Sequence, residues 1–364
     1  MNILFMNSIS AHKFGGGEKW MAVAAKGLSE KGHKVILASR RHSEILRRAE
    51  ALGVATRELT IHGDCSPIKT LQIAKFLKQQ KMDVLICNLN KDVRVAGLAA
   101  RLIGSPVVIA RHGILLCGKK LKHKIALTKL TDGILTNTQT IKKAYADYGW
   151  FDDNFVKVLY NGIEDKTSVK AFDFASEFGN KKVILSAGRL ADQKGFSYLI
   201  EAAAILKDKC DDLVFVIAGQ GKLEHALKKQ VEQHRLDNFH FWGFREDVDS
   251  LMKGCDLFVL PSLYEGMPNA VMEAMAVGKA VVSTDVNGAR ELMIDGETGV
   301  IVPPRDSTIL AESIRTLINQ PQLLKAYGEA GQARVLAHFT IPQMVENLET
   351  YFLQKINDKA NQKE

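Results

Sequence analysis

The chain has 364 residues, 46% of them hydrophobic, and a formal net charge of +8. This length is enough for two domains of ordinary size, each with its own core. No apolar run approaches the roughly 18 to 20 residues of a spanning helix, and MNILFMNSIS has no basic region before a long apolar stretch, so we expect neither a transmembrane segment nor a signal peptide.

Strand-like apolar runs alternate with helical periods from the first residue. The runs are 2–7, 34–39, 83–88, 106–111, 132–137 and 156–163. Repeated strand and helix units require a mainly parallel sheet with helices on both faces. The pattern then lapses across 164–182, a polar stretch without clear periodicity, which predicts a linker.

The alternation restarts in the second half and predicts a second Rossmann-like sheet. Its strand-like runs are 182–188, 213–219, 239–243, 256–262, 280–284 and 298–304. Helices are expected over 306–319, 321–337 and 340–355, and the polar tail 357–364 is expected to fray. Because ligands of open parallel sheets bind at the carboxyl ends of strands, the loops after these runs are the candidate site.

The basic charge lies entirely in the first half of the chain. Residues 1–165 hold 26 Lys and Arg against 14 Asp and Glu, a balance of +12, which leaves −4 for the remainder. This asymmetry predicts an anionic partner: a membrane, a nucleic acid or an acidic acceptor. Nucleic acid is disfavoured, because no aromatic residues interleave the cations and no recognised binding module is present.

The densest basic cluster is CGKKLKHKIALTKL at 117–130, where lysines alternate with leucine and isoleucine. Its lysines are Lys119, Lys120, Lys122, Lys124 and Lys129. Such a segment can lie on an anionic membrane surface, or it can be a solvated helix whose apolar face packs in the core.

A glycine loop, Gly15, Gly16 and Gly17, follows the first strand-like run and precedes a helix that begins near Glu18. Such a loop lets backbone approach a pyrophosphate or a sugar, although a plain flexible turn has the same composition. It is not GxGxxG, and no acidic residue about 20 positions later marks a dinucleotide ribose, so a nicotinamide enzyme is disfavoured.

The stretch YEGMPNAVMEAMAVGKAVVST, 264–284, carries the strongest indication of a ligand site. Pro268 predicts a helix that begins near Asn269, which puts Glu265 in the loop and Glu273 about one turn inside the helix. A helix N-terminus suits an anionic group and a carboxylate suits paired hydroxyls, so a ligand with phosphates and sugar hydroxyls fits both. The alternative is that Glu265 caps a turn and Glu273 is a solvated helix residue.

This stretch resembles the family 4 glycosyltransferases of the GT-B fold, whose C-terminal domain has two glutamates separated by seven residues in an EG(F/M)P loop and an EAMA helix. Here the motif is EGMPNAVMEAMA. Two further motifs flank it, SAGRLADQKGFSYLIEA at 186–202 and DVNGARELMIDGETGVIVPPRD at 285–306, and the GGGE loop opens the chain. The four motifs follow the family's order and span nearly the whole length.

The resemblance implies two Rossmann-like domains that face each other across a cleft. We expect an acceptor-binding domain at 1–165, a nucleotide-sugar-binding domain at 166–337, and a C-terminal helix at 338–364 that returns to the first domain.

The resemblance also implies roles for individual residues. Glu265 would hold the transferred sugar and Glu273 the ribose hydroxyls, while Arg189 and Lys194 would stabilise the departing diphosphate. The residues expected to line the sugar or distal phosphate are Gly266, Met267, Pro268 and Asn269.

Four further positions are expected at the site. Gly219 and Gly221 would let backbone approach the nucleotide, Arg245 lies where the family holds the base, and His112 would lie beside the reacting sugar. No DxD-type motif follows a strand, so no metal is expected, and no cofactor is expected beyond a UDP-sugar or GDP-sugar that acts as substrate.

The expected activity is that of a metal-independent, retaining hexosyltransferase in lipopolysaccharide, capsule or other surface-glycan assembly, with a glycan or lipid-linked acceptor. The alternatives are a nucleotide-sugar 2-epimerase of GT-B fold and a non-catalytic nucleotide-sugar-binding protein. The five cysteines are odd in number and form no CxxC pair, which favours a reducing cytoplasm over a disulfide framework or zinc site. Contact with the cytoplasmic face of the inner membrane, through 117–130, is the accompanying hypothesis.

Overall fold

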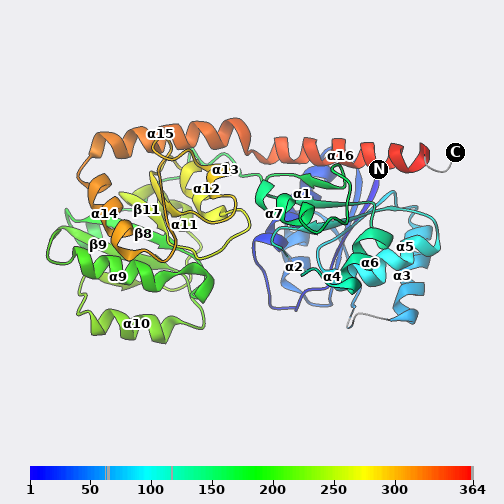
Figure 1. Ribbon diagram of the computed structural model, residues 1–364, viewed down its shortest axis with the longest axis horizontal. Helices are drawn as coiled ribbons and strands as arrows, with labels where there is room; N and C mark the ends of the chain where they lie inside the picture. The colour runs from blue at the N-terminus through cyan, green and yellow to red at the C-terminus, as the bar shows by residue number, and fades with distance from the viewer. Residues whose placement is uncertain (62, 64–65, 116–117, 362–364) are drawn as a thin grey trace. The chain divides into compact units, whose positions relative to one another are not determined.

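The computed structural model describes residues 1–61, 63, 66–115 and 118–361. The chain divides into two compact units, of which the first comprises Met1–Gly162 with Ile341–Glu364 and the second Ile163–Thr340. Each unit is an α/β sandwich around one parallel sheet (Figure 1). The predicted α/β architecture of two Rossmann-like sheets is confirmed.

The first unit is built on a parallel sheet whose described strands have the order β3-β2-β1-β4-β5-β6-β7. The strands are β1 (Asn2–Asn7), β2 (Lys34–Ser39), β3 (Ala55–Glu58), β4 (Val84–Cys87), β5 (Val107–His112), β6 (Gly133–Thr136) and β7 (Val156–Val158). The central strands β1, β4 and β5 are almost wholly buried, as continuous apolar runs in parallel sheets are.

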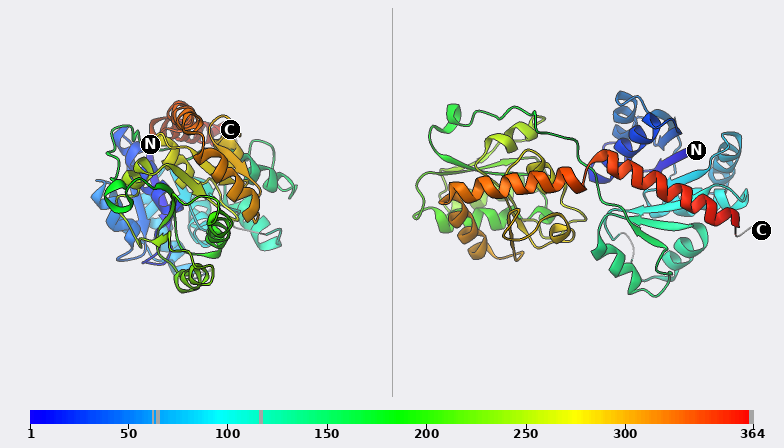
Figure 2. Two further views of the ribbon diagram at one scale, coloured as in Figure 1. Left: turned by 90° about the vertical axis from the view of Figure 1, so that its left-hand side faces the viewer. Right: turned by 90° about the horizontal axis from the view of Figure 1, so that it is seen from above.

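Helices cover both faces of this first sheet (Figure 2). One face packs against α1 (Gly16–Glu30), α2 (Glu44–Ala51) and α16 (Ile341–Asn361). The other packs against α3 (Pro67–Gln79), the continuous helix made of α4 (Asn90–Asp92), π-helical η1 (Val93–Gly97) and α5 (Leu98–Leu102), and then α6 (Leu121–Leu130) and α7 (Gln139–Ala146).

The second unit repeats the plan with the strand order β10-β9-β8-β11-β12-β13. Its strands are β8 (Lys182–Ala187), β9 (Leu213–Ala218), β10 (Phe239–Phe241), β11 (Leu257–Leu260), β12 (Val281–Thr284) and β13 (Val300–Val302). One face packs against α9 (Phe196–Leu206), α10 (Glu224–Gln233) and α14 (Ser307–Ile318). The other contacts α11 (Val248–Gly254) and α12 (Asn269–Ala276), and α15 (Pro321–His338) packs on α12.

The stretch predicted as a linker, 164–182, belongs to the second unit. It contains the short helix α8 (Ala175–Phe178), and Phe172 and Phe174 lie with ring centroids 5.5 and 5.4 Å from that of Trp242. Its aromatic side chains, which the polar composition concealed, therefore anchor it to the second sheet.

The last helix, α16, contributes to the core of the first unit with Met344, Leu348 and Phe352. The expectation that the tail frays from residue 357 is wrong up to Asn361, because α16 continues to that residue. The ammonium group of Lys359 donates to the carbonyl of Pro106 at 2.7 Å and to Asp132 at 3.3 Å, which holds the last turn against the sheet. Within the described part of the chain, no helix is both long and apolar enough to cross a membrane.

Candidate functional site

The switch point of the second sheet lies between β8 and β11. From β8 the chain proceeds to β9 on one side, and from β11 it proceeds to β12 on the other. Connections that leave adjacent parallel strands in opposite directions open a crevice at the carboxyl edge, where ligands of such sheets bind. The loop after β8 carries Arg189 and Lys194, and the loop after β11 carries Glu265.

Glu265 is the centre of a hydrogen-bonded network at this switch point. Its Oε1 accepts from Lys194 Nζ at 2.7 Å and from Ser262 Oγ at 2.8 Å, while its Oε2 accepts from Gln193 Nε2 at 3.2 Å. The side chains of Lys194 and Glu265 are only 18% and 10% exposed. The structure thus brings two predicted residues into direct contact, and adds two that sequence reasoning missed.

Arg189 joins the same network through Gln193. Arg189 Nη2 donates to Gln193 Oε1 at 3.4 Å, and Gln193 Nε2 also donates to the carbonyl of Tyr264 at 3.1 Å. One amide therefore lies between the guanidinium group and the carboxylate. Gln193 stands inside the QKG motif, beside Lys194, and the motif was the only signal of its role.

Gly219 and Gly221 let the loop after β9 lie against the loop after β8. A Cβ at Gly219 would overlap the carbonyl oxygen of Gly188, and a Cβ at Gly221 would overlap that of Leu190. Gly219 also has a φ of 156°, which favours glycine. These glycines have a packing role in the unit itself, and their approach to a nucleotide stays a prediction.

Helix α12 begins at Asn269, as predicted, with Pro268 as the residue before it. Gly266, Met267 and Pro268 are buried, and Glu273 is the partly exposed fifth residue of the helix. The first backbone N–H groups of α12 therefore lie at the carboxyl edge that also holds the Glu265 network, because α12 follows β11 in a parallel sheet.

Arg245 is held by groups of its own loop. Its Nε and Nη2 donate to the two carboxylate oxygens of Asp247 at 2.7 and 2.6 Å, and its guanidinium carbon lies 5.2 Å from the ring centroid of Trp242. The hydrogen bonds to Asp247 raise the pKa of Arg245 above its usual value. The neighbouring Phe244, which the sequence did not point to, is 62% exposed.

The switch point of the first sheet lies between β1 and β4 and contains a buried carboxylate, Glu18, on α1. Glu18 Oε2 accepts from the backbone N–H of Gly15 at 3.0 Å, and Oε1 accepts from Asn7 at 3.0 Å and from Asn88 at 3.4 Å. The glycine loop is therefore fixed by a carboxylate from α1 and by amides from the ends of β1 and β4. Sequence reasoning treated Glu18 only as the start of a helix and missed Asn88.

Arg111 lies over this network and is only 5% exposed. Its guanidinium carbon is 4.5 Å from the ring centroid of Trp20, and its Nη1 donates to Asn88 Oδ1 at 3.4 Å. Burial lowers the pKa of Arg111 to about 10, which still leaves the group charged at neutral pH. A Cβ at Gly17 would lie 3.3 Å from that Nη1, so the loop and the cation are adjacent.

His112 follows Arg111 at the end of β5 and is fully buried. Its Nδ1 lies 2.5 Å from the hydroxyl of Tyr145, and its Nε2 has no hydrogen-bond partner among the described residues. Burial, and secondarily the charges of Arg111 and His123, lower the pKa of His112 to about 3. The imidazole is therefore neutral at physiological pH, with one nitrogen left for a further hydrogen bond.

Asp92 connects the two loops of the first switch point and is wholly buried. Its Oδ2 accepts from the backbone N–H of Ser8, just after β1, at 3.1 Å. Burial raises the pKa of Asp92 to about 6.

The basic segment 117–130 forms α6 from Leu121 onward, whereas Cys117 lies outside the described residues. Ala126 and Leu127 are buried, but Leu121 and Ile125 are 71% and 53% exposed. The helix thus packs through one part of its apolar side and presents another part, between lysines, at the surface.

No group of three or more His, Cys, Asp and Glu side chains suited to a metal ion is found in the described ranges. Cys87, Cys210 and Cys255 are free thiols, whereas Cys65, like Cys117, is outside those ranges. The charged groups gathered at the second switch point are instead two cations and a carboxylate, which suit a ligand that carries both phosphates and hydroxyls.

Comparison with known proteins finds a family match in each half of the chain. Residues 169–334 match the model of the glycosyl transferases group 1, and residues 14–167 match that of glycosyltransferase family 4. A Bacillus subtilis protein named as a glycosyltransferase, EpsD, is 31% identical over 320 residues, which are 79% of this chain and 82% of that protein.

Two further relatives differ in how much of each chain is aligned. The UDP-Gal:alpha-D-GlcNAc-diphosphoundecaprenol alpha-1,3-galactosyltransferase of Escherichia coli is 25% identical over 309 residues, 79% of this chain and 80% of that enzyme. The alpha-D-kanosaminyltransferase of Streptomyces kanamyceticus is 34% identical over 168 residues, so this chain spans only 44% of that enzyme's length, using 45% of its own.

Among solved structures, that of Anabaena Alr3699/HepE in complex with UDP superposes with a TM-score of 0.86. The match covers 97% of this chain and all of the other at 21% identity, and it shows a shared fold. With one family model on each half and a relative 31% identical over most of its length, the chain belongs to the group 1, family 4 glycosyltransferases.

Proposed function

We propose that the protein transfers a hexose from a UDP-sugar or GDP-sugar to a glycan or lipid-linked acceptor, with retention of anomeric configuration. The observation that carries the proposal is the contact of Lys194 with Glu265 at the second switch point, beside the start of α12. UDP is the favoured nucleotide, because the Anabaena protein of the same fold is in complex with UDP.

Glu265 and Lys194 bind different parts of the donor. An ammonium group has three donors, and Lys194 uses one on Glu265, so it can contact a phosphate oxygen without releasing the carboxylate. A carboxylate oxygen has more than one acceptor site, so Glu265 can also accept from hydroxyls of the transferred sugar. Arg189 adds the second cation, at the far side of Gln193.

The remaining donor contacts follow from the loops. The N–H groups of Gly266, Met267 and Asn269 contact the sugar or the distal phosphate, and Pro268 sets the start of α12. Glu273 accepts from ribose hydroxyls, and Arg245 with the exposed ring of Phe244 offers a face to the base. Four glycines give backbone access to the donor, namely Gly16, Gly17, Gly219 and Gly221.

The bond from the sugar's anomeric carbon to the diphosphate oxygen breaks while the acceptor hydroxyl oxygen bonds to the same face of that carbon. The electron pair leaves with the diphosphate, and the acceptor's proton passes to a departing phosphate oxygen. The transition state is oxocarbenium-like, as in other glycosyl chemistry. Lys194, Arg189 and the N–H groups of α12 stabilise the negative charge that grows on the diphosphate.

The two cations take the role that a divalent metal has in other nucleotide-sugar enzymes, and no cofactor enters beyond the donor itself. Transfer is then expected to persist at full rate in excess EDTA. A rate that collapses with EDTA and returns with added magnesium or manganese would contradict this part of the proposal.

His112 serves the reacting sugar as a neutral hydrogen-bonding group. If the Tyr145 hydroxyl donates to Nδ1, the imidazole proton resides on Nε2, which then donates to a sugar hydroxyl. Tyr145→Phe is expected to lower kcat with little change in the affinity for UDP, and an unchanged kcat would remove this role.

The defining experiment incubates the purified chain with a panel of nucleotide sugars, with and without lipid or sugar acceptors. Transfer supports the proposal, whereas epimerisation or binding without turnover contradicts it. Glu265→Gln and Lys194→Ala should lower the transfer rate by about 10² to 10³. Lys228→Ala, in the exposed pair of Lys228 with Glu224 on α10, is the matched control and should leave the rate unchanged. Near-normal transfer by both site variants would remove the assigned roles.

The biological setting we propose is assembly of a bacterial surface glycan, lipopolysaccharide or capsule among them, in the cytoplasm at the inner membrane. The basic helix α6, with Leu121 and Ile125 exposed between lysines, supports contact with anionic lipid.

Vesicle flotation tests this contact. Binding should increase with anionic lipid and fall when four lysines at the start of α6 are reversed to glutamate. Lys119 and Lys120 directly precede the helix, and Lys122 and Lys124 lie in its first turns. Reversal of Lys142 and Lys143 on α7 is the control. Binding that ignores both lipid charge and the α6 reversal would contradict the membrane contact.

A further inference from the structure

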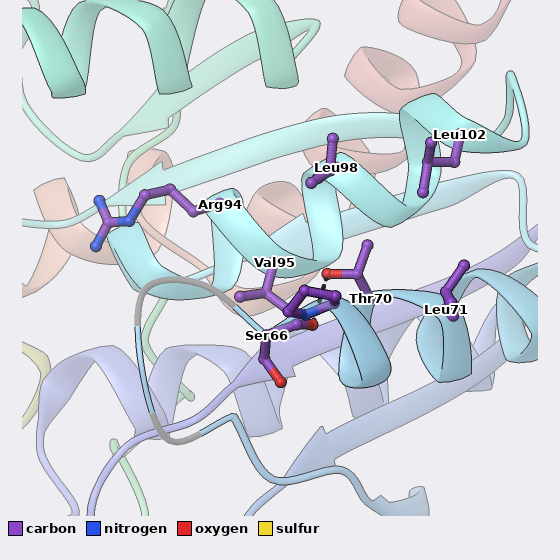
Figure 3. Close-up of a pocket in the computed structure, with 8 residues that line it drawn as sticks. Ser66, Thr70, Leu71, Arg94, Val95, Leu98 and Leu102 are labelled. Carbon is purple, nitrogen blue, oxygen red and sulfur yellow. Dashed lines mark hydrogen bonds between the residues drawn. The ribbon is translucent and has the colours of Figure 1, made fainter.

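A groove with a cavity volume of about 270 Å³ runs between α3 and the continuous helix formed by η1 and α5 in the first unit (Figure 3). Its walls include Thr70, Leu71, Arg94, Val95, Leu98 and Leu102. Pockets for whole small ligands usually enclose about 300 to 1,000 Å³, so this groove suits one segment of a slender molecule. It was not predicted from the sequence.

The groove is apolar and open to solvent along its length. Leu71, Leu98 and Leu102 are 64%, 43% and 60% exposed, whereas Val95 is buried beneath them. The hydroxyl of Thr70 donates to the carbonyl of Ser66 at 3.0 Å, so it offers little to a polar ligand. Three leucines on one concave surface together expose more apolar area than an isolated surface residue does. An apolar patch of this kind points to a ligand.

Among the described residues that line the groove, the one charged side chain is that of Arg94. Figure 3 shows Arg94 at one end of the helix that lines it, Leu98 in the middle and Leu102 at the other end. Helices that connect parallel strands run opposite to them, so the earlier residues of this helix lie nearer the carboxyl edge of the sheet. Arg94 is therefore toward the edge that holds Asn88 and the glycine loop, and Leu102 is away from it.

We propose that this groove holds the polyprenyl chain of a lipid-linked acceptor, with the diphosphate beside Arg94 and the sugar at the carboxyl edge. The inference rests on the proposed function, since it assumes a diphosphate-linked lipid as acceptor. The acceptor named for the Escherichia coli relative is a diphosphoundecaprenol, which joins an anionic diphosphate to a long apolar chain of isoprene units. The charged end and the leucine end of the groove match those two parts in order.

A bilayer surface is a poorer match for the same residues. Anionic lipid head groups suit a helix that exposes apolar side chains between lysines, as α6 does with Leu121 and Ile125. The α3 to α5 surface is concave instead, with its buried floor at Val95. A single chain can lie in it between Arg94 and Leu102.

The test uses the full chain and three probes: farnesyl diphosphate, inorganic pyrophosphate and UDP. Burial of a few apolar carbon groups of the farnesyl chain favours binding, so farnesyl diphosphate should bind at least about tenfold more tightly than pyrophosphate in calorimetry. The variant with Leu98→Gln and Leu102→Gln should lose that advantage. Arg94→Gln should lower the affinity for both farnesyl diphosphate and pyrophosphate. The affinity for UDP should be unchanged in every variant.

The matched control is Leu353→Gln, because Leu353 on α16 is 47% exposed, close to the 43% of Leu98, and lies outside the groove. This variant should bind all three probes as the unaltered chain does. Hydrogen exchange should show protection of α3 and α5 when farnesyl diphosphate is added, and no such protection with pyrophosphate.

Two outcomes overturn the inference. One is farnesyl diphosphate binding that matches pyrophosphate or is unaffected by the Leu98 and Leu102 changes. The other is that those changes release the chain from phosphatidylglycerol vesicles while farnesyl diphosphate binding persists, which would make the groove a membrane-contact surface. In either case, a chain that still binds UDP and transfers sugar would leave the proposed function intact. The proposed function itself would fail if the unaltered chain showed neither UDP binding nor sugar transfer.

Discussion

Replacing Lys194 with methionine removes one charged donor from Glu265 and keeps the aliphatic stem that packs near Gly188. Exposed ion pairs contribute about 0.2 to 1 kcal/mol, and breaking a fully buried pair costs about 3 to 5 kcal/mol. With side chains 18% and 10% exposed, the pair lies between these cases. We expect the free energy of unfolding of the second unit to fall by about 2 kcal/mol, which lowers Tm by about 4 to 8 °C for a unit of this size.

Glu265→Gln perturbs the same network from the other side. If the amide oxygen keeps the place of Oε1, the amide nitrogen faces Gln193 Nε2, and two donors oppose each other. Gln193 resists a flip, because its nitrogen also donates to the Tyr264 carbonyl. Combining this change with Lys194→Met should therefore cost less than the sum of the two single changes.

Urea unfolding of the two single variants and the double variant measures this coupling, and UDP-induced thermal shifts report the binding site in the same samples. UDP at about 100 times its Kd should add about 2.7 kcal/mol to the stability of the unaltered chain and less to either variant. Lys228→Met, in an exposed pair, is the control. Single changes that cost nothing and add without coupling would refute the network, and a Lys194→Met enzyme with unaltered kcat would refute its role in transfer.

Burial of Asp92 raises its pKa and favours its neutral form, so the free energy of unfolding should fall as the pH rises from about 4 to about 6. Asp92→Asn should remove this fall in urea unfolding between pH 4 and 7.5. The same pH dependence of stability in both proteins would argue against it. Gly219→Ala should destabilise the second unit by about 2 kcal/mol or more, because the new methyl meets the carbonyl of Gly188 at a φ that favours glycine; unchanged Tm and UDP affinity would contradict that packing. Gly27→Ala should lower the free energy of unfolding of the first unit by about 1 to 3 kcal/mol, because the new methyl overlaps Val345 on α16, despite a helix propensity gain of about 1 kcal/mol. Calorimetry should show that Val345→Ala, added to Gly27→Ala, restores part of this lost stability.

The sequence predicted the secondary structure well where burial dictates composition. Parallel strands buried on both faces become continuous apolar runs, so β1, β4, β8 and β11 could be located from hydrophobicity, and the start of α12 from Pro268. Glu265 and Lys194 could be predicted as site residues because each lies in a short motif of neighbouring residues.

Partners distant along the chain could not be found in this way. Glu18 and Asn88 are 70 residues apart, and Glu265 and Lys194 are 71 apart. No local period encodes such a pair, because strand order decides which loops become neighbours. The extension of α16 to Asn361 has the same origin, since Lys359 finds its acceptor at Pro106, 253 residues earlier.

The placement of α16 in the first unit also determines when that unit can be completed during synthesis. Its core needs Leu348 and Phe352, yet the whole second unit is translated between Gly162 and these residues. At about 5 to 20 residues per second, translation of the second unit takes roughly 10 to 40 s. During this time the side of α1 that packs against Val345 in the finished protein is uncovered. A chain whose synthesis stops soon after Thr340 would therefore hold a complete second unit and a first unit that lacks α16.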